Sequence, residues 1–65
     1  MASKETETKK GTGEAKREEG LEVAIDRAWD DAKNNGAQAG DTLTIHSIQF
    51  IGHNPIRGYV VHVGL

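Results

Sequence analysis

Three histidines are the side chains of this sequence best suited to chemistry near neutral pH. His46 and His62 lie in two apolar, β-branched segments, and His53 lies in the stretch between them. If these segments pair as strands with His46 and His62 directly or diagonally opposite, the two imidazoles share one face of the sheet. Such a pair could bind a metal ion or respond to pH. No third ligand of a suitable type is near in the sequence, so we prefer two half-exposed strand histidines and predict no metal site.

The remaining polar residues give little sign of catalysis. Tyr59 follows closely on Arg57 and could form a recognition pair with it, although a tyrosine at the start of a strand is commonplace. Glu22, Asp26 and Asp30 are spaced four apart, which could attract calcium or pair an acid with a base, but a solvated helix face is the preferred interpretation. No nucleophile or phosphate-loop signature is present. We therefore predict that the protein is not an enzyme and carries no cofactor.

Length and composition restrict the possible classes of protein. The chain has 65 residues, no cysteine, a formal net charge of -2 and 35% hydrophobic residues. That length allows a single domain, and without cysteine it has neither disulfides nor thiolate metal sites. The near-neutral charge argues against a nucleic-acid partner. No apolar stretch is long enough to span a bilayer and no signal-peptide core follows the first charges, so we expect no membrane partner and a cytoplasmic location.

The chain divides into a polar arm and one folded unit. Residues 1–14 are almost free of apolar side chains, which predicts a disordered arm, and residues 15–65 form the single domain. The alternation over residues 5–8 is at most a marginal first strand, because it has no apolar face. A helix is expected over about residues 15–34, with Gly20 as either a weak point or its true start, and Gly36 as a stop. Its apolar stripe consists of Leu21, Ala24, Ile25, Ala28, Trp29 and Ala32.

Two strands follow the helix, over residues 41–51 and 59–65, with a turn at residues 52–58. Leu43 and Ile45 share one face of the first strand, whereas Ile48 and Phe50 share the other. Either both faces are partly buried, or a bulge near residues 46–47 shifts the register by one. The predicted fold class is therefore α+β, one helix packed on an antiparallel β-hairpin, αββ or possibly βαββ. The expected core comprises Leu21, Ile25, Ala28, Trp29, Leu43, Ile45, Ile48, Phe50, Tyr59, Val61 and Val63.

A hairpin and one helix make a thin core with two exposed sheet edges. We therefore expect a homo-oligomer in which another copy completes the sheet. The alternative is an interaction module that presents a strand edge, or its N-terminal arm, to a different protein partner.

The order of helix, glycine-containing loop, long strand, turn and final strand resembles the dodecins over about residues 20–65. The features that carry the resemblance are the helical segment at residues 24–29, the strand lengths and Val63-Gly64 near the end. The resemblance implies a small βαββ protein that assembles into hollow spheres, and in many family members binds flavin. This sequence departs from the dodecins in its polar first segment and in residues 41–44, which lack the family's flavin-stacking tryptophan. The resemblance therefore does not imply that this protein binds flavin. Gln49 would stand where a polar side chain contacts the ring, and with His46, Tyr59 and His62 it completes the candidate ligand-binding residues.

Overall fold

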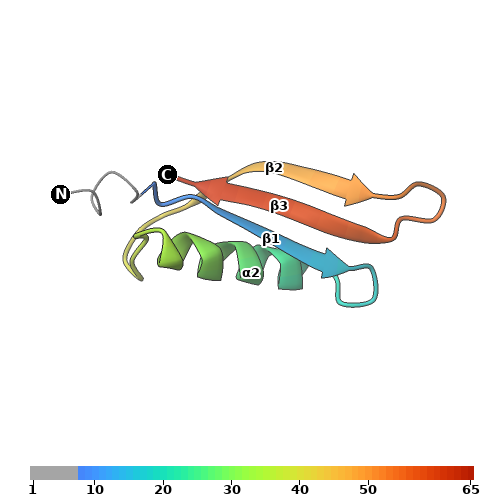
Figure 1. Ribbon diagram of the computed structural model, residues 1–65, viewed down its shortest axis with the longest axis horizontal. Coiled ribbons are helices and arrows are strands. Elements are labelled where there is room, and N and C mark those ends of the chain that lie inside the picture. The colour runs from blue at the N-terminus through green and yellow to red at the C-terminus, as the bar shows by residue number, and fades with distance from the viewer. Residues whose placement is uncertain (1–7) are drawn as a thin grey trace.

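One helix packs on one face of a three-stranded antiparallel sheet in the computed structural model, which describes residues 8–65 (Figure 1). The elements are β1 (Gly11–Lys16), α2 (Leu21–Asn34), β2 (Thr44–Ile51) and β3 (Gly58–Gly64). The strand order is β1-β3-β2, so the last strand lies in the centre of the sheet. The predicted α+β class, with a helix packed on an antiparallel hairpin, is confirmed, and the β1 strand makes the order βαββ.

Strand β1 lies later in the chain than the alternation at residues 5–8 suggested. Its residues pair with β3 from Gly11 opposite Val63 to Lys16 opposite Gly58. Residues 11–14, expected in the disordered arm, therefore belong to the folded unit, whereas residues 1–7 of that arm lie outside the described residues. The sequence concealed this strand because its buried positions are glycine and alanine, which give no apolar alternation.

Those small residues allow the helix to lie directly on the strand. Gly11 and Gly13 face Ala24, Ala28 and Ala32 of α2, and all three alanines are fully buried. A Cβ atom built on Gly11 would lie 2.1 Å from the carbonyl oxygen of Ala28, and one on Gly13 would lie 2.1 Å from that of Ala24. The contact is thus made largely by backbone, and it depends on the absence of side chains at these two positions.

Helix α2 begins at Leu21 rather than at residue 15. Gly20 precedes it with a φ of 90°, a conformation that glycine adopts without the steric cost borne by other residues. Residues before this glycine make a turn and the strand, so Gly20 marks the true start of the helix. At the other end the backbone N–H of Asn35 donates to the carbonyl of Ala32, and Gly36 has a φ of 106°, as expected for a stop.

Of the two alternatives for the irregular alternation in this strand, the structure has the bulge. Ile45 pairs with Val63 and Ser47 with His62, which leaves His46 as the extra residue between them. The strand begins at Thr44 rather than at residue 41. Because the bulge shifts the alternation by one, Ile45, Ile48 and Phe50 all lie on the side of the sheet that carries the helix.

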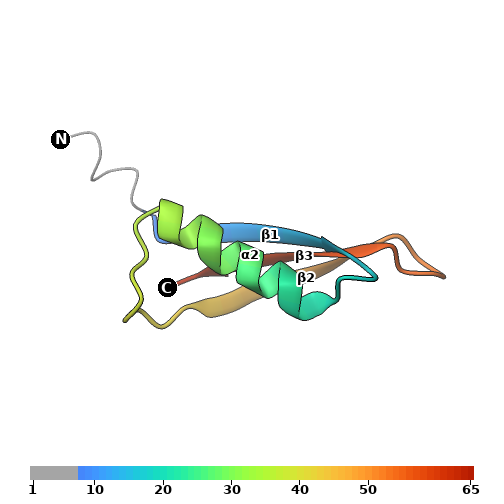
Figure 2. The same ribbon diagram turned by 90° about the horizontal axis from the view of Figure 1, so that it is seen from below.

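The core is smaller than the sequence predicted. The prediction that Ile45, Ile48 and Phe50 are buried is wrong, because these side chains are 43%, 38% and 61% exposed. The helix contacts β1 and β3 but not β2, and it lies on the β1 side of the sheet in Figure 1. Figure 2 shows the helix running at an angle to the strands. The buried apolar residues are Ala15, Ala24, Ala28, Ala32, Ala37, Val61 and Val63, with Leu21, Val23, Ile25, Trp29, Leu43 and Tyr59 partly buried around them.

No helix within residues 8–65 is long and apolar enough to cross a membrane.

Candidate functional site

A row of polar side chains crosses all three strands on the face of the sheet opposite the helix. Thr12 of β1 lies directly opposite His62 of β3, and its Oγ1 is 3.0 Å from Nδ1 of the imidazole. Nε2 of His62 lies 3.4 Å from Oε1 of Gln49 in β2. Both ring nitrogens therefore have partners, which holds the ring in place. The ring can bind a metal ion only after one of these contacts is broken.

His46 and His62 line one hollow of about 470 Å³ on the same polar face. Lys10 and Thr12 contribute to its walls, and Gly64 leaves space between His46 and Lys10. A Cβ atom on Gly64 would lie 3.0 Å from Nε2 of His46 and 3.1 Å from Cγ of Lys10. The hollow thus gathers an ammonium group, two imidazoles and a hydroxyl, a set of donors suited to a small polar or anionic molecule.

Tyr59, the fourth candidate, lies on the other face. Its ring meets that of Phe50 at a centroid distance of 6.0 Å and an interplanar angle of 70°, an edge-to-face contact. The structure therefore brings His46, Gln49 and His62 together and separates Tyr59 from them. Among residues 8–65 no group of three or more His, Cys, Asp or Glu side chains is arranged to hold a metal ion.

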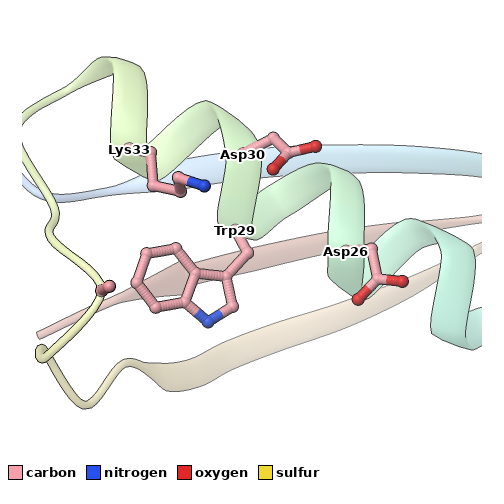
Figure 3. Close-up of a pocket in the computed structure, with 5 residues that line it drawn as sticks. Asp26, Trp29, Asp30 and Lys33 are labelled. Carbon is pink, nitrogen blue, oxygen red and sulfur yellow. The ribbon is translucent and has the colours of Figure 1, made fainter.

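A second hollow, of about 540 Å³, lies beside the helix (Figure 3). The indole of Trp29 extends from α2 over the sheet toward the loop that carries Ala39, whereas the carboxylates of Asp26 and Asp30 point away from the ring. Lys33 also lines the hollow and offsets part of the negative charge. The indole mainly serves as packing at the border of the core, because it is only partly buried against it.

Three of the exposed large apolar side chains, those of Ile45, Ile48 and Phe50, share one face of β2, and we call this the β2 surface. It lies next to the helix on the same side of the sheet, and β2 is exposed along its whole length. Sequence reasoning recognised these residues as apolar but placed them in the core. The bulge at His46, which the alternation did indicate, is the signal that groups them on one face.

An ion pair fixes the turn that joins β1 to α2. Arg27 donates to both carboxylate oxygens of Glu19, at 3.0 Å and 2.7 Å, and also to the carbonyl oxygen of Glu14 at 2.9 Å. The hydrogen bonds from the Arg27 guanidinium and from the Lys16 backbone N–H lower the pKa of Glu19 to about 2. This arrangement is structural, since it holds the start of the helix against the strand.

No protein-family model matches the chain, and neither a curated protein nor a solved structure matches it. The resemblance to the dodecins therefore stays a prediction. The features that bear on function are the hollow at His46 and His62 and the β2 surface.

Proposed function

We propose that this protein is a non-enzymatic module that associates with copies of itself through the β2 surface. The observation that carries the proposal is the placement of its large apolar side chains. Ile45, Ile48 and Phe50 share one exposed face, whereas the largest fully buried side chain is Val61. A contiguous apolar patch of this kind is typical of an interaction surface.

The small size of the core supports the same proposal. Of the seven buried apolar residues, five are alanines, and the chain has no disulfide to compensate. Small domains without disulfides commonly gain stability from oligomerisation. Covering the β2 surface would place its three large side chains in a core that two or more copies share.

The expected strength of association follows from the exposed fractions. Full burial of such a side chain is worth about 1.5–3 kcal/mol, so covering roughly half of each contributes about 1 kcal/mol. Six side chains in a pair of copies then contribute about 6 kcal/mol, close to the lower end of the 4–15 kcal/mol cost of association. The apolar contact alone therefore gives weak binding, and additional contacts are needed for a stable oligomer.

The proposal includes a dodecin-like assembly, in which many copies form one particle. The cytoplasm is the expected location. Small-ligand storage would belong to such an assembly, with the hollow at His46 and His62 as the place for the ligand. A chromophore that sediments with the protein at visible wavelengths would indicate such a ligand. A colourless protein would remove chromophore storage from the proposal.

The test compares molecular masses in solution. Ile48→Lys places a charge in the middle of the β2 surface, and Gln38→Lys adds the same charge in an exposed part of the loop before β2. We expect the unmodified chain and Gln38→Lys to share one oligomeric mass, and Ile48→Lys to be a monomer by light scattering after gel filtration. Equal masses for all three proteins would contradict the proposal. A monomeric unmodified chain would favour the alternative, a different protein partner.

A further inference from the structure

The two edges of the sheet differ in how their backbone groups are satisfied. At the β1 edge, the N–H of Thr12 donates to Asp31 at 2.9 Å and the N–H of Lys16 donates to Glu19 at 2.8 Å. The carbonyl of Lys10 accepts from Asn35 at 2.7 Å. Arg27 donates to the carbonyl of Glu14 in the same way. Side chains from the turn and the helix therefore occupy most of the groups that another strand would need.

The same bonds show which backbone groups point outward. Lys10, Thr12, Glu14 and Lys16 are alternate residues, so the residues between them bond to β3. The backbone N–H and C=O groups of Val61 and Tyr59 in β3 consequently point toward β1, whereas those of Val60 point toward β2. Across β2, the partners of Val61 and Tyr59 are Ile48 and Phe50. Their N–H and C=O groups are therefore directed away from the sheet.

The β2 edge lacks the protection that the β1 edge has. Among residues 8–65, no side chain or loop hydrogen-bonds to the outward backbone groups of Ile48 and Phe50. The strand, with the sequence TIHSIQFI, contains no lysine, arginine, acidic residue or proline. Natural sheets use such residues, or covering elements, to prevent pairing at an edge. Beyond the bulge at His46, residues Ser47–Ile51 form an uncharged and uncovered edge that is suited to pairing with another strand.

We infer that β2 pairs antiparallel with β2 of a second copy, so that two sheets join into one of six strands. This inference rests on the proposed self-association and names the contact that produces it. A second copy meets no charge repulsion at this edge, because β2 carries no lysine, arginine or acidic side chain that would be brought together with its own copy. The backbone bonds supply the additional contacts that the apolar side chains alone lack.

The register follows from the bulge. Ser47–Ile51 is the regular part of β2, and a symmetric antiparallel pairing of these five residues centres on Gln49. The outward backbone N–H and C=O groups of Ile48 then hydrogen-bond to those of Phe50 in the second copy. By symmetry, those of Phe50 bond to Ile48 of the second copy. Directly opposite residues share a face. Both helices therefore lie on one side of the joined sheet. Ile48 of each copy packs beside Phe50 of the other, so that the two β2 surfaces cover one another in part.

The test uses single cysteines in a chain that has none. Gln49→Cys would place two thiols directly opposite each other across the symmetry axis, where Cβ atoms lie about 4.5–5.5 Å apart. Glu14→Cys is the matched control, since Glu14, Val60 and Gln49 lie in one row across the sheet. Glu14 occupies the capped edge and Gln49 the open one. Under mild oxidation at equal concentration, we expect a disulfide dimer of twice 7.0 kDa for Gln49→Cys, formed at least tenfold faster than for Glu14→Cys.

Two results would overturn the pairing of β2 strands. One is equal cross-linking of the two variants, and the other is no cross-linking of Gln49→Cys although the protein remains oligomeric. In the second case self-association stands and only its geometry is wrong, because the masses of the unmodified chain and of Ile48→Lys test association independently.

Discussion

Replacing Gly13 by alanine tests the close contact between helix and strand. The added Cβ would lie 2.1 Å from the Ala24 oxygen and 2.3 Å from the Ala28 nitrogen, both backbone atoms. Ordinary contacts of a Cβ begin near 3.4 Å, so α2 and β1 must separate by roughly 1 Å. Overpacking of a tight core costs typically 1–3 kcal/mol, and we expect a loss of about 3 kcal/mol because backbone cannot change rotamer.

The direction of the stability change distinguishes a steric clash at Gly13 from the general effect of replacing glycine by alanine. Where the native backbone and its surroundings allow it, Gly→Ala stabilises by about 0.4–1 kcal/mol through the unfolded state. Gly40→Ala is the matched control, because a Cβ there meets nothing within 4 Å and its φ is not positive. For 65 residues a total stability of roughly 3–10 kcal/mol is typical, so Gly13→Ala should remove a large part of it.

The assay is urea unfolding followed by circular dichroism at one protein concentration for all variants, because association adds to apparent stability. We expect the urea midpoint of Gly13→Ala to fall sharply, or the variant to be unfolded without urea. The free energy of unfolding of Gly40→Ala should equal that of the unmodified chain or exceed it by up to about 1 kcal/mol. A Gly13→Ala protein as stable as Gly40→Ala would refute the packing of α2 directly on β1.

Two further predictions concern the side chains that tie the helix to the β1 edge. Asp31→Ala removes the acceptor of the Thr12 N–H. In urea titrations it should lower the free energy of unfolding by about 1 kcal/mol, the usual net value of one hydrogen bond. The control Asp30→Ala breaks no hydrogen bond of the described residues and should change the free energy of unfolding less. Glu19 has a folded-state pKa of about 2 against 4.5 unfolded, so it stabilises the fold fully above about pH 4.5 and loses this contribution as the pH falls toward 2. Because the pair is at the surface, salt should weaken the effect. Acid unfolding of Glu19→Gln should show less dependence on pH in this window, and identical acid titrations of variant and unmodified chain would contradict the role of the ion pair.

The sequence predicted the elements whose signals are periodic. The apolar stripe of α2, the hairpin and the bulge at His46 all follow from the spacing of apolar residues. The first strand could not be found in this way, because Gly11, Gly13 and Ala15 are buried by close approach of backbone rather than by hydrophobic side chains. The helix start was left between residue 15 and Gly20 for the same reason: residues 15–19 are compatible with a helix, and only the pairing of Ala15 and Lys16 with β3 shows that the helix starts after Gly20.

The site was only partly predictable for a related reason. The shared face of His46 and His62 followed from their positions in facing strands, but Thr12 and Lys10 come from a segment with no visible strand signal. Ile45, Ile48 and Phe50 were assigned to the core by hydrophobicity alone. Only the lateral position of the helix, over β1 and β3, shows that they are exposed.

Sedimentation velocity of the unmodified chain over a wide concentration range tests self-association most directly. We expect a mass of at least twice 7.0 kDa that falls toward that of the monomer on dilution, because the apolar contact alone is weak. A single species of 7.0 kDa at every concentration would contradict it. The β2 surface would then have to be covered by a different protein.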